Sequence, residues 1–381
     1  MRLVFLTSSV FGAAFGLMAA PAAADSYSAS GARLDYVAAE VTVITEDRAD
    51  IDVSISPAGR LPAPTVRVEG SRVVIDGGLR NRLHGCTSTL TGGDQVRVRG
   101  LGNVARSELP RITLRTPRTL DLSIGGAAYS SIGSSAGGAV SHNGCGDTDI
   151  ADASGALEVA LNGSGDVEVS RVGGALKAAL NGSGSLTVTS ADGNAELRLN
   201  GSGDLRTGAV RGDVDAVLAG SGALRVQAAR HAVVRLNGSG DVDVGDVAGA
   251  VDARLGGSGG IDIGSAGQGA RLALNGSGDF DVGSVRGPLN ADLSGSGSID
   301  VASAEGPSAE LRQSSSGDVT VRGGRVDRLV ARNSGSGSVR FGGVAGASTI
   351  EVRSSGDVTV ADAGRVESLV DTGSGGARLG N

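Results

Sequence analysis

The sequence predicts an all-β protein whose main body is a parallel β-helix, a solenoid of about 19 residues per coil. Three observations support this fold. A Gly-Ser-Gly triplet recurs at steps of 18 to 20 residues, short strands with alternating apolar residues flank the triplets, and equivalent positions in successive repeats hold similar residues. A period this short is typical of solenoids, in which each repeat contacts only its neighbours. The middle serines of the triplets are Ser164, Ser183, Ser202, Ser221, Ser239, Ser258, Ser277, Ser296, Ser316, Ser336, Ser355 and Ser374; around Ser316 and Ser355 a serine takes the place of the first glycine.

Each repeat contains two short strands. Leu157, Val159 and Leu161 alternate with polar or small residues, and the same alternation follows the triplet over residues 166–169. This period of two is typical of strands with one buried face. We expect the Asn-Gly-Ser-Gly stretch between the strands to form a sharp corner in which the glycines adopt positive φ angles, and a second corner near residues 173–174.

Successive coils are expected to stack so that like residues form ladders. The inward positions of the first strand read Leu-Val-Leu at 157, 159 and 161, Leu-Ala-Leu one coil later and Ala-Leu-Leu in the next. In a parallel β-helix each coil rises by one strand spacing, ~4.8 Å, and backbone groups pair with the coils above and below. Because one repeat cannot bury its apolar face alone, the stability of the fold must come from stacking between neighbours.

The repeats divide the chain into three parts. Residues 1–24 contain Arg2, an apolar run from Leu3 to Ala20 and a small-residue stretch, which is the pattern of a cleavable signal peptide. Residues 25–118 lack the triplet and hold strand-like runs broken by prolines, which predicts a β-rich N-terminal cap with irregular first coils. Residues 119–381 are predicted to form the parallel β-helix.

The charge balance restricts the partners. After removal of the signal peptide the chain keeps 33 of its 34 basic residues and all 41 acidic ones, a net charge of −8, because Arg2 is the only charge removed. This balance disfavours nucleic acid and anionic membranes as partners. No later segment approaches the ~20 apolar residues that a spanning helix needs, so we expect no transmembrane segment after signal cleavage.

The exported chain keeps two cysteines, Cys86 and Cys145, and an oxidising compartment favours a disulfide between them. Cys145 takes the place of the triplet serine in an early coil, so the bridge would pin the N-terminal region to the solenoid, over its open first edge. His84 and His142 lie near the two cysteines in the sequence. A Cys2His2 metal site is therefore the alternative, although the spacings match no CxxC-type knuckle.

Polar rows are expected along the corners. Asparagine precedes the triplet on several coils and predicts a ladder of amides at Asn162, Asn181, Asn200, Asn237 and Asn275. Aspartate follows every second triplet, so the true unit is two coils, or 38 residues. Aspartates on every coil would lie ~4.8 Å apart and repel, and skipping a coil avoids this without an ion. Calcium at the Gly-Ser-Gly-Asp corners, as in β-roll proteins, is the alternative.

The Asn-Gly-Ser-Gly-Asp-Val-x-Val unit, behind a signal peptide and a segment such as residues 66–75, resembles the GIN-domain family of autotransporter adhesin heads. The resemblance covers most of the exported chain. It implies a right-handed parallel β-helix in a bacterial envelope or secreted setting, which for a Gram-negative bacterium means the periplasm or the cell surface. It implies no catalytic residues, because that family has none established.

We therefore expect a non-catalytic exported solenoid, without cofactor or metal, that serves as a scaffold or adhesin-like surface for an envelope or extracellular polymer or protein. The alternative is a carbohydrate-active β-helix enzyme, a polysaccharide lyase or hydrolase, which needs converging carboxylates and usually aromatic platforms for sugars. Gln313, Asn333 and Ser348 replace aliphatic residues late in the chain. This change predicts a poorly protected C-terminal edge that is open to self-association.

Overall fold

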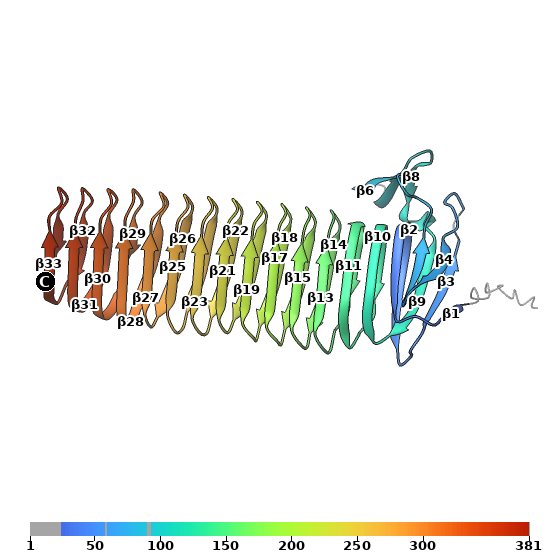
Figure 1. The fold of residues 1–381 in the computed structure, drawn as a ribbon, viewed down its shortest axis with the longest axis horizontal. Coiled ribbons are helices and arrows are strands. Elements are labelled where there is room, and N and C mark those ends of the chain that lie inside the picture. Colours follow the sequence, from blue (N-terminus) through green and yellow to red (C-terminus); the bar gives the residue numbers. More distant parts are fainter. Residues whose placement is uncertain (1–23, 58, 90–92, 381) are drawn as a thin grey trace, which may run out of the picture.

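The computed structural model describes residues 24–57, 59–89 and 93–380 and shows a parallel β-solenoid of about 14 turns, with roughly 19 residues per turn. The coils stack along one axis into a long rod, with irregular strands at its N-terminal end (Figure 1). The predicted all-β fold class and coil length are confirmed. The predicted signal peptide, residues 1–24, lies outside the described residues except for Ala24.

Each regular coil contributes a first strand before the Gly-Ser-Gly corner and a second strand after it. The first strands are β13 (Leu157–Leu161), β15 (Leu176–Leu180), β17 (Ala195–Leu199), β19 (Val214–Leu218), β21 (Ala232–Leu236), β23 (Val251–Leu255), β25 (Ala270–Leu274) and β27 (Leu289–Leu293). The second strands are β14 (Asp166–Val172), β16 (Ser185–Ala191), β18 (Asp204–Val210), β20 (Ala223–Ala229), β22 (Asp241–Val247), β24 (Gly260–Ala266) and β26 (Asp279–Arg286).

Coils at the two ends have longer or shorter strands. The early ones are β10 (Thr119–Ile132), β11 (Gly137–Cys145) and β12 (Asp147–Ile150). The late ones are β28 (Ile299–Gln313), β29 (Val319–Val321), β30 (Gly324–Asn333), β31 (Val339–Val352), β32 (Val358–Asp362), β33 (Arg365–Asp371) and β34 (Ala377–Leu379).

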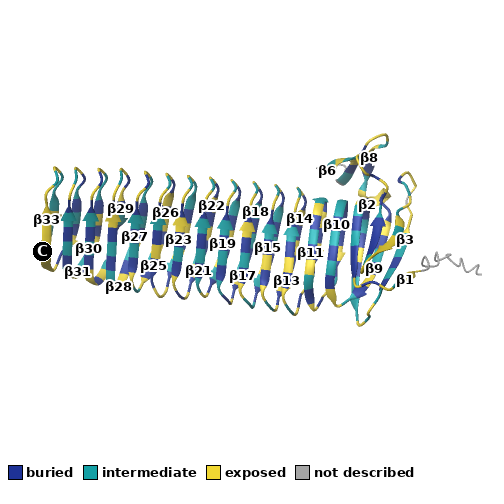
Figure 2. Ribbon diagram, viewed as in Figure 1, coloured by how far each residue is buried: buried dark blue, intermediate teal, exposed yellow. Residues whose placement is uncertain are grey.

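The register places like residues directly above one another. Leu161 of β13 pairs with Leu180 of β15, and Leu180 pairs with Leu199 of β17. This position holds leucine in eight consecutive coils, all buried: Leu161, Leu180, Leu199, Leu218, Leu236, Leu255, Leu274 and Leu293. Burial of one such side chain contributes roughly 1.5–3 kcal/mol. Since buried residues alternate with more exposed ones along the first strands of the regular coils, these strands share one apolar interior (Figure 2).

The corner glycines are needed for a different reason than the sequence suggested. No glycine of the Gly-Ser-Gly triplets, nor of the second corner at 173–174, has a φ in the left-handed region, so the expected positive φ angles are wrong. Instead, a Cβ on Gly201 would lie 1.9 Å from the carbonyl oxygen of Gly182, and one on Gly203 would lie 2.0 Å from that of Gly184. The backbones of neighbouring coils approach so closely at the corner that no side chain fits between them.

Antiparallel strands end the stack at the N-terminus. β2 (Gly31–Glu46) pairs in parallel with β10 on one edge and with β5 (Arg72–Asp76) and β9 (Arg111–Pro117) on the other. Beyond them, β3 (Ile51–Ser56) pairs antiparallel with β9 and with β1 (Asp25–Tyr27), and β4 (Thr65–Glu69) pairs antiparallel with β5. The first parallel edge of the solenoid is thereby covered, as stable sheets require.

A second, three-stranded sheet projects from the side of the rod near its N-terminal end (Figure 1). We call β6 (Leu83–Thr89), β7 (Gly93–Val98) and β8 (Gly102–Ala105) the projecting sheet; the short 3-10 helix η1 (Arg106–Glu108) follows it. Its residues Val96, Val98 and Val104 are buried in one cluster with Ala127 and Tyr129 of β10.

The predicted disulfide between Cys86 and Cys145 is present and joins β6 to the end of β11. It does not cover the first edge of the solenoid, as the sequence suggested. Since Cys145 lies at a corner, the bridge fastens the projecting sheet to the flank, and β3, β4, β5 and β9 form the cover.

Amides replace the leucine ladder in the late coils. Gln313 and Asn333 point inward and are 1% exposed. Gln313 Nε2 donates to the carbonyls of Ser315 at 2.6 Å and Gly317 at 2.8 Å, and Asn333 Nδ2 donates to the carbonyl of Gly337 at 2.7 Å. Hydrogen bonds to the corner of the same coil therefore compensate for the lost apolar contact.

The last described coil is less well covered. Ser348 of β31 is buried with its hydroxyl unpartnered, and Val366, Leu369 and Val370 of β33 are 42%, 50% and 37% exposed. All of β33 is exposed, in contrast to the strands behind it (Figure 2). Self-association through this edge stays a prediction.

We predict that Gly201→Ala destabilises the protein by about 1–3 kcal/mol, because the new methyl group would overlap a backbone carbonyl that cannot move alone. Gly260→Ala is the matched control: its Cβ would lie 3.4 Å from the flexible Asp241 carboxylate, and Ala223 occupies the same position two coils earlier. Thermal unfolding followed by circular dichroism measures both. Equal losses in the two variants would contradict the close-approach explanation.

His142 supplies a second prediction. It lies in the ladder between Ile124 and Leu161, is 1% exposed, and contacts Thr148 Oγ1 at 2.9 Å through Nδ1, while Nε2 has no partner. Burial lowers the pKa of His142 below its ordinary 6.5. The unfolded chain therefore takes up the proton first, so the stability due to neutral His142 is complete above about pH 6.5 and is lost as the pH falls through the lowered value.

We predict that the double change His142→Leu/Thr148→Val raises the free energy of unfolding by roughly 1 kcal/mol and removes part of the loss of stability on acidification. Urea unfolding at pH 5 and pH 8 measures this. Thr207→Val is the control, since it also fills a buried ladder position, between Val188 and Val226, but removes no titratable group. An unchanged pH dependence in the double variant would show that His142 does not titrate with unfolding.

Candidate functional site

The outer surface of the second strands carries a row of four stacked aspartates. Asp243, Asp262, Asp281 and Asp300 lie in direct register on four consecutive coils. They line a hollow of about 370 Å³. The hollow exists because the residue two positions after each aspartate has little or no side chain to fill it. These residues are Gly245, Gly264, Gly283 and Ala302. We call these four carboxylates the acidic row.

The acidic row concentrates like charge. Partial burial, and then the carboxylates of Asp281 and Asp243, raise the pKa of Asp262. Arg322 reaches only the end of the row, where its Nη2 lies 3.2 Å from Asp300 Oδ1. This row was not predicted from the sequence as a unit, because the predicted aspartate pattern concerned only the residue directly after each triplet. Aligning the repeats two positions further along would have found it.

The alternating aspartates directly after the triplets have a different role. Asp318 Oδ1 accepts hydrogen bonds from the backbone N–H of Ser338 at 2.7 Å and from its hydroxyl at 2.6 Å. The same pair of bonds joins Asp279 to Ser298. These bonds explain the two-coil unit: an aspartate on one coil accepts from a small residue on the next. Charge repulsion alone does not, since the acidic row places aspartates on consecutive coils.

Metal binding receives no support from the geometry. Over residues 24–57, 59–89 and 93–380 no three histidine, cysteine or acidic side chains are arranged to hold an ion. The alternative Cys2His2 site is wrong, because Cys86 and Cys145 are bonded to each other and His142 points into the solenoid. His84 instead accepts from Arg99, whose Nε lies 3.3 Å from His84 Nε2.

The predicted asparagine ladder is continuous over part of its length. Asn162 Nδ2 donates to Asn143 Oδ1 at 2.8 Å, Asn181 to Asn162 at 2.8 Å, and Asn200 to Asn181 at 3.0 Å. The next coil has Ala219 at this position, and the row then alternates. Asn237 and Asn275 are separated by Gly256, so the structure does not join them to each other, and Asn275 accepts instead from Ser294 at 2.5 Å.

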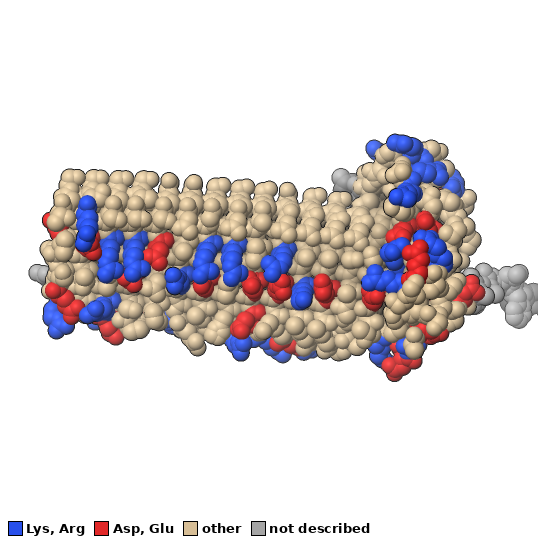
Figure 3. Space-filling model, in the orientation of Figure 1, with Lys and Arg blue, Asp and Glu red and all other residues tan. Residues whose placement is uncertain are grey.

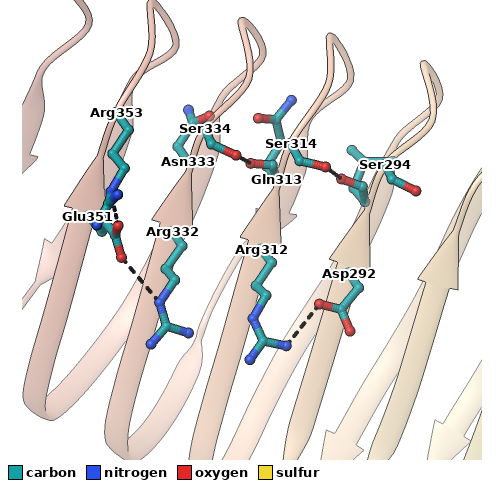
Figure 4. A pocket seen from close by; sticks show the side chains of 11 residues that line it. Asp292, Ser294, Arg312, Gln313, Ser314, Arg332, Asn333, Ser334, Glu351 and Arg353 are labelled. Atoms are coloured by element: carbon teal, nitrogen blue, oxygen red, sulfur yellow. Dashed lines mark hydrogen bonds and ion pairs between the residues drawn. The ribbon is translucent and has the colours of Figure 1, made fainter. Parts of the chain in front are cut away.

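The outer surface of the first strands is neutralised by ion pairs between coils. Arg312 contacts Asp292 at 3.1 Å and Glu310 at 2.5 Å, and Arg332 contacts Glu310 at 2.6 Å and Glu351 at 3.3 Å. All of these side chains except Glu310 line a hollow of about 330 Å³, in which Arg312 points to Asp292 and Arg332 points to Glu351 of neighbouring coils (Figure 4). Basic and acidic side chains are interspersed along the rod (Figure 3). This hollow therefore has no unpaired charge to offer an ionic ligand.

A family model matches more than half of the chain. Residues 111–248 and 284–378 match the family model described as "Putative auto-transporter adhesin, head GIN domain". Among solved structures, a putative lipid-binding protein from Parabacteroides distasonis is similar at 15% identity and a TM-score of 0.29, over 87% of this chain and 96% of the other. A putative adhesin from Bacteroides fragilis is similar at 16% identity and a TM-score of 0.26, over 68% and 96%. No curated protein matches the chain significantly.

The two kinds of aspartate predict opposite effects of substitution. The charged form of Asp318 is favoured in the fold, since the hydroxyl of Ser338 lowers its pKa, so its contribution is present above the ordinary 3.8 and lost as the pH falls through the lowered value. The charged form of Asp262 is disfavoured, so its repulsion disappears as the pH falls through the raised value.

We therefore predict that Asp262→Asn raises the Tm at pH 7 by about 2 °C and that this gain shrinks towards pH 4 and in high salt. Asp318→Asn should lower the Tm at pH 7. Thermal scans at several pH values test both, and a loss of stability in Asp262→Asn at neutral pH would contradict the repulsion within the acidic row.

Proposed function

Because this chain belongs to the family of GIN domains described as auto-transporter adhesin heads, we propose that it is a non-catalytic binding protein of the bacterial cell envelope. In this proposal the signal peptide directs export, and the rod acts as a scaffold whose outer rows contact an envelope or extracellular polymer. Within the described residues there is no helix with the length and apolar character of a membrane crossing. The periplasm and the cell surface of a Gram-negative bacterium are the compartments proposed.

The observation that carries this proposal is the stacking of identical outward side chains at a spacing of one coil, ~4.8 Å. The acidic row and the amide ladder each present the same group on consecutive coils. A rigid array of this kind matches a partner that is itself repetitive, since each repeat of the partner meets an equivalent group. A single catalytic centre has no need of such repetition.

The alternative, a carbohydrate-active enzyme, has one specific observation in its favour. Asp262 has a raised pKa and lies in a hollow among other carboxylates, which is the setting of a general acid. Against it, Phe280 and Phe341 are buried inside the coils and Tyr129 is buried under the projecting sheet. These rings are not available to stack on a sugar beside Asp262.

We predict that the exported chain binds envelope polysaccharides on a glycan array and releases no reducing sugar from any of them. A reducing-end assay on each bound polysaccharide measures turnover, with Asp262→Asn as the matched variant. Release of reducing ends by the native chain that is lost in Asp262→Asn would overturn the non-catalytic proposal and establish the enzyme. Absence of binding to every polymer on the array would also count against a binding role.

A further inference from the structure

The projecting sheet holds an unusual group of cations. Most arginines of this protein contact a carboxylate, as Arg312 and Arg332 do on the rod. Four in or beside the projecting sheet, within residues 79–105, have no carboxylate within ion-pair distance in the described part of the chain: Arg80, Arg82, Arg97 and Arg99. The one acidic residue of this stretch, Asp94, contacts Arg106 outside it, at 3.3 Å. In a chain of net charge −7 this end is therefore locally basic.

The sheet directs these side chains to solvent. Val96 and Val98 of β7 are buried against the solenoid, so Arg97 between them and Arg99 after them are exposed. Arg82 donates to the carbonyl of Arg99 at 3.3 and 3.2 Å, which holds the two arginines together. The space-filling view shows blue side chains gathered over the projecting sheet (Figure 3).

A cavity of about 580 Å³ lies where the projecting sheet meets the first coils. Leu34, Leu79 and Leu83 give it apolar walls, and Tyr36 and Asn81 also line it. Its one carboxylate lining group, Asp35, is neutralised by Arg33 at 2.9 Å. Ser123, Asn143 and Ser164 also line it, so the cavity offers both apolar and polar contacts, as small-ligand sites do.

The backbone at this cavity is strained in a way that the rest of the molecule is not. Among the described residues only Tyr36 and Asn81 combine a side chain with a positive φ, of 51° and 60°, and both line the cavity. Tyr36 lies at the bulge where the register between β2 and β10 shifts. Asparagine tolerates this region better than tyrosine does, so the strain is greatest at Tyr36, where it costs about 1–3 kcal/mol, and such strain clusters at functional sites.

The aromatic ring of Tyr36 and one of these cations, Arg80, meet at this place. The guanidinium of Arg80 lies 5.6 Å from the ring centroid of Tyr36, and the ring is 40% exposed, so part of its surface is open to a ligand. Arg80 and Arg82 flank Asn81 in the chain, between the cavity residues Leu79 and Leu83. Guanidinium groups bind carboxylates and phosphates with two parallel hydrogen bonds.

We propose that this cavity binds an anionic sugar unit of an envelope polysaccharide. The apolar face of the sugar ring packs on the exposed part of the Tyr36 ring, its hydroxyls bond to Asn81, and its acidic group faces Arg80, whose guanidinium lies against that ring. This inference rests on the proposed function, because it names the chemistry of one unit of the polymer and the place where the rod holds it. That place shares no lining residue with the acidic row, whose carboxylates would repel an anionic unit. A lipid surface is less favoured: apart from Tyr36, the only large apolar side chain exposed at this end of the described chain is Val68.

Titration calorimetry of the exported chain with a galacturonate oligomer tests the proposal, and a galactose oligomer of equal length is the neutral comparison. We expect the acidic oligomer to bind at least tenfold more tightly, with an affinity that falls as salt rises. Arg80→Gln/Arg82→Gln should weaken binding at least tenfold. Tyr36→Asn, which suits the left-handed backbone but removes the ring, should weaken binding about fivefold.

Arg271→Gln/Arg286→Gln is the control, because it removes two arginines of the solenoid that also have no carboxylate within ion-pair distance among the described residues. It should leave binding within twofold. Circular dichroism and the Tm confirm that each variant is folded. Equal binding of both oligomers, equal losses in test and control variants, or no binding of the acidic oligomer would each overturn the proposal. Binding of anionic phospholipid vesicles in its place would overturn it in favour of a membrane.

The two proposals can fail separately. If array binding of polysaccharides persists in Arg80→Gln/Arg82→Gln, the cavity is not the site, but the non-catalytic binding role stands. If the native chain cleaves the galacturonate oligomer, the binding role as proposed is wrong, while the location of the anionic sugar can still be tested with these same variants.

Discussion

Backbone pairing between consecutive coils, at one strand spacing of ~4.8 Å, is the constraint from which the other features follow. It brings the corners of neighbouring coils so close together that a Cβ on Gly201 would lie 1.9 Å from the carbonyl oxygen of Gly182. It also stacks the eight ladder leucines from Leu161 to Leu293 directly on one another, so that the apolar core runs from coil to coil. No coil has a core of its own, and the fold is stable only as a stack.

The same stacking has opposite consequences for polar groups, depending on what stacks. Amides gain from it, since each asparagine both donates and accepts, as Asn181 does between Asn162 and Asn200. Mixed charges gain as well, because Arg312 reaches carboxylates on its own and the adjacent coil. Like charges lose, and the acidic row is the place where the repeat tolerates this loss. The carboxylates of the acidic row repel one another and so do not stabilise the fold. This is why we assign a binding role to the outward surface.

Irregularity is confined to the ends, and the two ends differ. At the N-terminal end antiparallel strands cover the parallel edge, and a disulfide fastens a basic sheet to the flank. The strained backbone of Tyr36 and Asn81 lies at this junction. At the C-terminal end amides such as Gln313 substitute for leucine, and β33 is exposed. The cavity therefore lies where the projecting sheet interrupts the repeat, beside the four arginines of residues 79–105 that have no carboxylate partner in the described chain.

The sequence by itself determined the coil length, the two strands per coil, the inward ladders and the bridge between Cys86 and Cys145, because these depend on a short period repeated many times and on the only two cysteines of the chain. Only the tertiary structure decided three further points. They are the reason why the corner glycines are required, the cover of the first edge by strands and not by the disulfide, and the position of Tyr36 beside Arg80. The physical reason is that a periodic pattern shows which residues are equivalent, but not how close the backbones of neighbouring coils come. The packing of a segment outside the repeat, such as the projecting sheet, depends on contacts between residues that share no period.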